Sequence, residues 1–178
     1  KAKTAPSTGK DQTDSLKRFH KLADEILVQS TQDALFIQRP VWRDRALVSI
    51  STNAAGSQQY RRALEITRLI PQPEVRTDAL VKIAELQARG NRQAEATATY
   101  EEAARAVASI PLDDPRAVLT GVLIDNLITV GRFEDARKCT ILYPDNARRY
   151  IALGAIAESQ GRRGQSQSAM AWIDSEIP

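Results

Sequence analysis

The stretch RTDALVKIAELQARG, residues 76–90, predicts an amphipathic helix that ends in a turn. Its aliphatic side chains, among them Leu80 and Ile83, fall close to one helical face. We expect Gly90 to end this helix with a positive φ angle. An alanine-rich run then repeats the pattern as far as Pro111, which stops the second helix because proline lacks an N–H group. Two amphipathic helices joined by so short a turn are predicted to lie antiparallel.

The same pattern of helix, turn, helix and proline recurs before and after this stretch. The closing prolines are roughly 30 to 40 residues apart, a period typical of helical repeat arrays. Counted from the arginine that follows each of the first four prolines, a large aliphatic residue falls at position 7 and an alanine at position 20. Four units in one register predict a repeat. The prolines are Pro40, Pro71, Pro111, Pro144 and Pro178, the arginines Arg43, Arg76, Arg116 and Arg149, the aliphatic residues Ile50, Ile83, Leu123 and Ile156, and the alanines Ala63, Ala96, Ala136 and Ala169.

Residues 123–136 resemble one unit of the tetratricopeptide repeat (TPR) family. Leu123 stands at the family's large aliphatic position, Gly131 near its glycine and Ala136 at its alanine, whereas Ile124 replaces a small residue. The family's tryptophan at position 4 and tyrosine at position 11 are missing, and most second helices end early. The resemblance covers roughly residues 41–178. It implies an all-α fold, namely an α-solenoid of about four to five antiparallel helix pairs in a right-handed superhelix. A different helical-hairpin repeat family with the same geometry would give the same solenoid.

The sequence divides into a tail and one domain. Residues 1–13 have no apolar period and contain Pro, Gly and hydroxyl residues, which predicts a disordered tail or linker. Residues 14–178 are predicted to form a single α-solenoid domain. Its first hairpin is irregular, with one helix starting near Asp14 and a second capped by Ser30 and Thr31. The predicted hairpins span about residues 14–40, 41–71, 72–111, 112–144 and 145–178.

The hairpin at residues 72–111 is longer than its neighbours. The extra residues all lie in its second helix and amount to about two turns, so that helix should project about 10 Å beyond its neighbours. The projection is either a specific contact surface or a tolerated length variant.

The charge of the chain is concentrated in its first residues. The chain has 25 Lys and Arg residues against 22 Asp and Glu residues, a net charge of +3. Lys1, Lys3 and Lys10 precede every acidic residue, so the numbers of basic and acidic residues are equal from residue 11 onward. Nucleic-acid-binding proteins usually have a basic folded surface, and many stack bases on aromatic side chains. Here the basic excess lies in the tail and only 5% of the residues are aromatic, so we do not expect this chain to bind nucleic acid.

The sequence leaves the compartment open. No apolar run reaches the roughly 18 residues that a membrane-spanning helix needs. We expect a soluble protein, either cytoplasmic or exported after removal of a signal peptide. The single cysteine, Cys139, excludes a disulfide within the chain and says little about compartment.

Catalytic and metal-binding chemistry has few candidate residues. His20 is the only histidine and is predicted to be a semi-exposed packing residue. Cys139 is predicted to be a small core residue rather than a reactive thiol. One histidine and one cysteine do not form a zinc ligand set, and the glycines at Gly161 and Gly164 lack the lysine of a phosphate-binding loop. We therefore predict no enzyme activity, no catalytic or metal residues and no cofactor.

A partner-binding groove is implied by the family resemblance. In that family, positions 2, 5, 9, 12 and 13 of the first helix face a concave groove. Here position 5 carries small residues, and position 9 gives an acidic stripe of Glu85, Asp125 and Glu158, suited to an extended segment with Lys or Arg. Nearby arginines could neutralise the stripe, which would make it an ordinary solvated face. The predicted contact residues are Val48, Thr52, Val81, Glu85, Arg89, Gly121, Asp125, Gly154, Glu158 and Arg162.

The four arginines that follow the prolines have two interpretations. Each is placed to reach the C-terminal carbonyls of the preceding helix or to pair across the joint between units. Alternatively they form a basic ridge that binds phosphates with salt-sensitive affinity.

The function predicted from the sequence is that of a non-catalytic protein–protein interaction scaffold or a subunit of a larger complex. Its groove would take a protein or peptide partner, such as a basic extended segment. The alternatives are a helical-repeat nucleic-acid-binding module and an accessory domain of a larger enzyme.

Overall fold

The computed structural model describes residues 9–176, and all of their regular structure is helical. The all-α class is therefore confirmed, and no strand occurs within these residues. The elements are α1 (Gly9–Leu35), α2 (Pro40–Gly56), α3 (Tyr60–Thr67), α4 (Pro73–Arg89), α5 (Gln93–Ala108), α6 (Asp114–Thr129), α7 (Phe133–Cys139), the short 3-10 helix η1 (Thr140–Leu142), α8 (Asn146–Arg162) and α9 (Ser166–Glu176).

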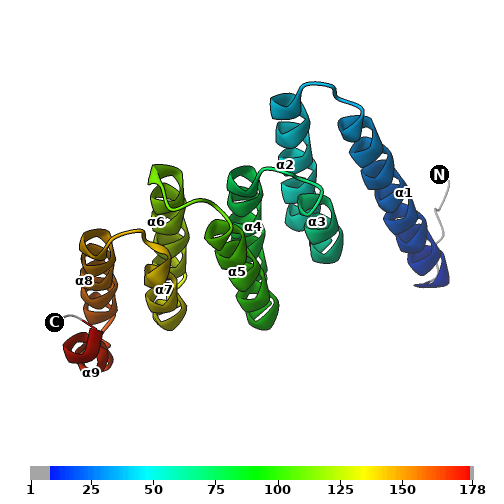
Figure 1. Cartoon of the computed structure of the whole chain (residues 1–178). Helices are drawn as coiled ribbons and strands as arrows, with labels where there is room; N and C mark the ends of the chain where they lie inside the picture. The colour runs from blue at the N-terminus through cyan, green and yellow to red at the C-terminus, as the bar shows by residue number, and fades with distance from the viewer. Residues whose placement is uncertain (1–8, 177–178) are drawn as a thin grey trace.

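The helices from α2 onward stand in a row of pairs (Figure 1). α2 packs on α3, α4 on α5, α6 on α7, and α8 on α9. The first helices of the pairs, α2, α4, α6 and α8, also contact one another in that order. In addition, α3, α5 and α7 each contact the first helix of the next pair. The described helices therefore form an open row, in which contacts between pairs are mainly those of neighbouring pairs.

The first segment of the chain differs from its prediction. One continuous helix, α1, replaces the predicted tail end and irregular hairpin, so residues 9–13 are helical and residues 1–8 lie outside the described residues. Thr31 caps nothing, because its hydroxyl donates to the main-chain oxygen of Leu27 one turn earlier, at 2.7 Å. No glycine or proline interrupts residues 10–39, so the helix has no reason to break at Ser30.

The repeated small and aliphatic positions build the core. At position 7, Ile83, Leu123 and Ile156 are completely buried, whereas Ile50 is only half-buried. The four alanines at position 20 are all buried, which lets the two helices of each pair approach closely. One apolar cluster runs continuously from α4 to α9, and two smaller clusters join α1 through α4.

The turn after α4 uses its glycine differently from the prediction. Gly90 has a φ of −78°, and the positive φ of 59° falls on Asn91 instead. The absence of a side chain at Gly90 makes room for Tyr60, since a Cβ there would lie 2.6 Å from the tyrosine oxygen. That hydroxyl donates to the main-chain oxygen of Leu86 near the end of α4, at 3.3 Å. The glycine thus serves packing between neighbouring pairs.

The longer hairpin carries its extra length where the sequence predicted it. α5 has 16 residues, whereas the corresponding helices α3 and α7 have 8 and 7. Among the described residues, no helix is both long enough and apolar enough to span a membrane.

Candidate partner-binding groove

A groove of about 520 Å³ lies between α6 and α8. Small residues make its floor, chiefly Gly121 on α6 and Ala152 and Ala155 on α8. Two aliphatic side chains flank it and are largely exposed, Val118 at 64% and Ile151 at 74%. Small residues at these helix positions leave the space open, and the exposed aliphatic groups make it apolar.

Tyr143 lines this groove from the segment that follows η1. A Cβ on Gly121 would lie 3.3 Å from the Tyr143 oxygen, so the glycine lets the tyrosine lie against α6. Burial raises the pKa of Tyr143, and the nearby carboxylate of Asp125 raises it further. The phenol therefore keeps its proton at neutral pH and presents an O–H donor beside the groove.

The groove carries carboxylates from two turns of α6. At its first turn, Asp114 accepts from Arg148 of α8 at 3.0 Å, which joins the starts of the two helices. Asp125 also lines the groove, is exposed, and has no ion-pair partner among residues 9–176. An unneutralised carboxylate next to an apolar floor suits a segment with a cation beside small or aliphatic side chains.

The structure brings two of the ten predicted contact residues, Gly121 and Asp125, into this groove. The predicted acidic stripe is broken on either side. Glu85 accepts a hydrogen bond from Arg89 at 2.5 Å, and Glu158 accepts one from Arg162. In both pairs the arginine lies one helical turn after the glutamate. The sequence left open whether nearby arginines neutralise the acidic stripe, and in the structure they do so at Glu85 and at Glu158.

The other predicted contact residues lie in different settings. Val81 is almost completely buried, which removes it from any contact surface. Val48 is half-buried, and the hydroxyl of Thr52 donates to its main-chain oxygen at 2.8 Å. Gly154 is exposed with open space around it, outside the lining of the groove.

Nine of the eleven lining residues were missed by the contact list from the sequence, and four of them show why. Val118 and Ile151 stand at position 2 of their units, one of the positions that the family resemblance implies for the groove, so a signal was available. Tyr143 and Arg148 lie in or beside the connection between pairs, where no helical period marks them.

The arginines after the prolines act mainly within the fold. Arg76 donates to the main-chain oxygen of Ile70 at 3.1 Å. Arg116 donates to those of Ile110, at 3.3 Å, and Leu142, at 2.9 Å. Ile70 and Ile110 follow α3 and α5, so both side chains reach the connection just past the preceding helix and not the helix's own last carbonyls.

The two remaining arginines pair with carboxylates instead. Arg149 donates to Glu176 of α9 at 2.7 Å, and Arg43 lies 3.3 Å from its neighbour Asp44. Their main contacts are therefore with acidic side chains, one across a helix pair and one within α2.

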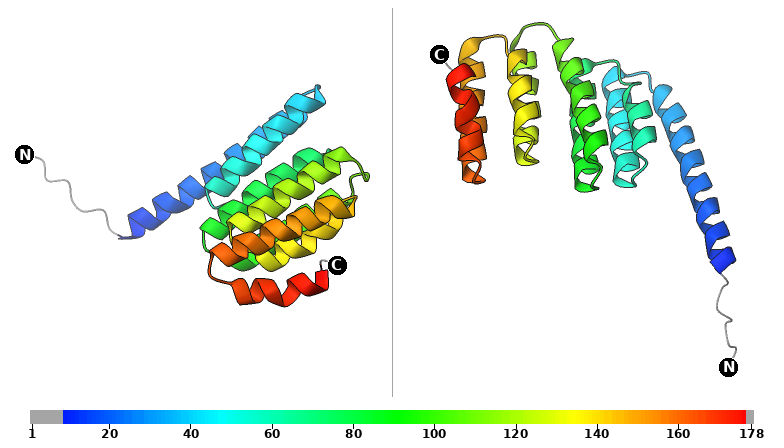
Figure 2. Two further views of the ribbon diagram at one scale, coloured as in Figure 1. Left: turned by 90° about the vertical axis from the view of Figure 1, so that its left-hand side faces the viewer. Right: turned by 90° about the horizontal axis from the view of Figure 1, so that it is seen from below.

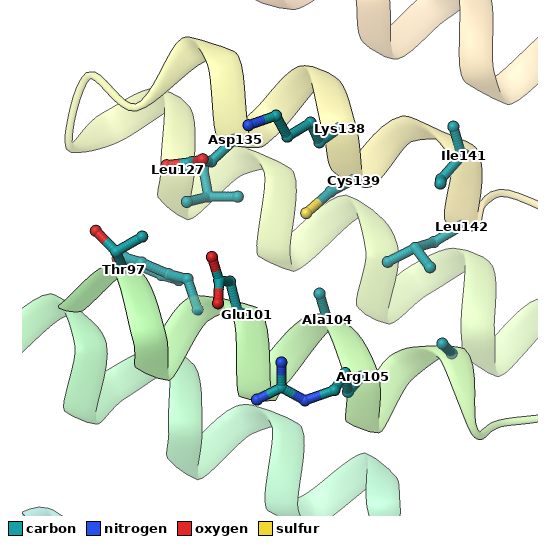
Figure 3. Close-up of a pocket in the computed structure, with 12 residues that line it drawn as sticks. Thr97, Glu101, Ala104, Arg105, Leu127, Asp135, Lys138, Cys139, Ile141 and Leu142 are labelled. Atoms are coloured by element: carbon teal, nitrogen blue, oxygen red, sulfur yellow. The ribbon is translucent and has the colours of Figure 1, made fainter. Parts of the chain in front are cut away.

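A second cavity, of about 280 Å³, lies between α5 and α7 (Figure 3). Tyr100 lines it with a buried hydroxyl that has no hydrogen-bond partner among residues 9–176, and burial raises the pKa of Tyr100 to about 12. Cys139 faces the same space, where burial and then Asp135 raise the pKa of the thiol to about 11. A thiol with so high a pKa is almost entirely protonated at pH 7, which agrees with its predicted place in the core.

Comparison with protein-family models, with curated proteins and with solved structures found no match to this chain. Its function is therefore argued from its own geometry.

Proposed function

We propose that this chain is a protein-interaction scaffold that holds an extended, basic segment of a partner in the groove between α6 and α8. The scaffold is a divergent TPR-like α-solenoid, whose helix pairs are arranged as a right-handed superhelix. Its work is binding, alone or as a subunit of a larger complex.

The repeat supports this architecture. The position-20 alanines are buried in all four units, and the first helices contact one another in chain order. In a solenoid, each helix pair contacts mainly the neighbouring pairs. Solenoid proteins bind their partners on the extended surface that this stack creates.

The observation that carries the function is the carboxylate of Asp125 beside an apolar floor. It has no ion-pair partner within residues 9–176, and an incoming Lys or Arg would supply one. The floor at Gly121 leaves room for a main chain to approach, and Tyr143 offers a hydroxyl to a main-chain carbonyl. An extended segment can use all three features together.

Two of the four arginines after the prolines favour a protein partner over nucleic acid. Arg76 and Arg116 direct their donors at main-chain carbonyls, so their charges are held at helix ends. A phosphate-binding ridge would need them directed outward.

The experiment measures binding of fluorescent eight-residue peptides, made of Ala, Val and Leu with one Lys, one Arg or neither. We expect fluorescence polarisation to show tightest binding for the basic peptides. Asp125→Asn should weaken that binding about tenfold, or about 1.4 kcal/mol. Ile151→Ser should weaken it severalfold through lost apolar contact.

Glu158→Gln is the matched control, because that carboxylate already pairs with Arg162 and lies outside the groove lining. It should leave affinity within about twofold. Equal binding of basic and neutral peptides, or an Asp125→Asn variant that binds as the wild type does, would refute the proposed site. Salt-dependent binding of a DNA or RNA oligonucleotide would favour the nucleic-acid alternative.

A further inference from the structure

The first half of α1 carries an apolar stripe that no other described element covers. Phe19, Leu22 and Ile26 are 69%, 52% and 56% exposed, and their spacing of three and four residues puts them on one helical face. α1 reaches well beyond the row of pairs (Figure 2). A contiguous apolar face of this kind on a helix marks a contact surface.

The neighbouring helix α2 is also incompletely covered on the side away from α4. Its residue Ile50 is half-buried, whereas its counterparts Ile83 and Leu123 are completely buried. Likewise Ala46 is half-buried, while Ala79 of α4 is completely buried. In α4 these positions pack against the preceding first helix, since Ile83 clusters with Ala54 and Ala55 of α2 and Ala79 clusters with Leu47. Among the described residues, α1 and α2 therefore lack the first-helix neighbour that later units have. The open slot beside them fits a helix antiparallel to α1.

The charges of α1 select the occupant of this slot. Around the stripe, Lys17, Arg18 and Lys21 precede Asp24 and Glu25 along the helix. An identical helix laid antiparallel brings basic residues to acidic ones at both ends of the contact. A parallel copy would place like charges together, so the antiparallel arrangement is favoured.

The stripe is also self-complementary about Leu22. Phe19 precedes Leu22 by three residues and Ile26 follows it by four, so in an antiparallel pair each Phe19 lies opposite the other copy's Ile26. Arg18 and Glu25 lie on the same flank of the stripe at similar distances from Leu22, so they also face each other across a two-fold axis. Arg18 has no ion-pair partner within the described residues, and Glu25 has only the exposed Lys21 at 3.8 Å.

We propose that this protein forms a two-fold symmetric homodimer through antiparallel contact of α1 with α1 of a second copy. Each α1 fills the slot beside α1 and α2 of the other copy, covering Phe19, Leu22, Ile26 and the exposed side of Ile50. The α6–α8 groove is built from other helices, so the dimer presents two such grooves.

The test is the mass of the whole chain by sedimentation equilibrium from 1 to 200 µM. We expect the mass to rise from 19.7 kDa to twice that value with concentration. Ile26→Glu should remain monomeric throughout the range, because it places a charge in the apolar contact. Met170→Glu, at an equally exposed apolar position on α9, should dimerise as the wild type does. Circular dichroism confirms that both variants keep their helical content.

A charge exchange tests the orientation. Arg18→Glu and Glu25→Arg should each raise the dimer dissociation constant severalfold, because each puts like charges opposite each other. The chain with both changes should recover wild-type affinity, since the pair is restored with its signs reversed. A wild-type chain that stays at 19.7 kDa at 200 µM, an Ile26→Glu chain that still dimerises, or a double variant no tighter than the single ones would overturn the proposal.

Discussion

At the scale of single residues, the glycines show how similar sequence signals acquire different roles. Gly131 and Gly164 have positive φ angles of 79° and 78°, the conformation expected at the end of a helix. Gly90 occupies the same kind of turn with a negative φ, and its importance comes from Tyr60 of the preceding pair. A short sequence window cannot separate these two roles, because the second depends on a tyrosine 30 residues earlier.

We expect Gly90→Ala to destabilise the protein by about 1–2 kcal/mol, because the methyl group would displace the Tyr60 hydroxyl from the oxygen of Leu86. Urea unfolding followed by circular dichroism measures the change. The control is Gly154→Ala in α8, where nothing lies within 4 Å of the added Cβ. That change should be stabilising by about 0.5–1 kcal/mol, because alanine favours helix. Equal effects at the two sites would contradict the role given to Gly90.

At the scale of the elements, ion pairs join helices of neighbouring units. Arg68, which follows α3, donates to both carboxylate oxygens of Glu102 on α5, at 2.9 and 2.8 Å. Arg148 and Asp114 similarly join α8 to α6. The 8-residue α3 is too short to be stable alone, since isolated helices shorter than about 12 residues are marginal. Contacts with neighbouring helices therefore hold it in place.

The pair of Arg68 and Glu102 predicts a pH dependence. Its hydrogen bonds hold the pKa of Glu102 below the usual value for glutamate, so the folded carboxylate binds a proton less readily than the unfolded one. The resulting stability is present above the unfolded pKa, about 4.3, and is lost as the pH falls through the lower folded pKa. Glu102→Gln should therefore cost about 0.5–1 kcal/mol at pH 7.

Urea unfolding of the wild type and Glu102→Gln at pH 7 and pH 3 measures this difference. We expect the gap between the two proteins to narrow at pH 3. As a control, Glu101→Gln changes an exposed carboxylate on the same helix that has no ion-pair partner among the described residues. It should shift stability by less than about 0.5 kcal/mol at either pH. If the difference in unfolding free energy between the wild type and Glu102→Gln is equally large at pH 3, the substitution acts through packing and not through charge.

At the scale of the whole molecule, the open row distributes stability unevenly. α4 packs against α2, α3, α5 and α6 and contributes to all three apolar clusters. α9, at the end of the row, packs mainly on α8, where Trp172 and Ile173 close the core. Because helix pairs contact mainly their neighbours, opening can occur locally at an end while the centre stays folded.

Native-state hydrogen exchange tests this distribution. We expect the amides of α4 to exchange slowest, at a rate set by global unfolding, and those of α9 to exchange about tenfold faster or more. Trp172→Ala should accelerate exchange in α8 and α9 without changing α2, because the removed contacts belong to the end of the row. Uniform protection along the chain, or acceleration that includes α2, would show a single cooperative unit.

Much of the helical framework could be predicted from the sequence. The helix after Pro71 and the long α5 follow from the spacing of aliphatic residues and the prolines that stop each helix. The division of α1 was wrong because Ser30 and Thr31 were interpreted as capping residues, although nothing nearby breaks the helix. For the groove, Gly121 and Asp125 were predicted, whereas Tyr143 was not, because it comes from an irregular connection.

The sequence by itself determined the class of the fold, the approximate extent of several helices and the repeated buried alanines, because these follow from local periodicity and helix-breaking residues. The tertiary structure alone decided which carboxylates are already paired, what Gly90 leaves room for, and where α1 and α2 remain uncovered. The space at Gly90 depends on a side chain 30 residues earlier, and the uncovered faces depend on the absence of a neighbouring helix among the described residues. For Glu85 and Glu158 the sequence places an arginine four residues on, but only the structure shows that they pair.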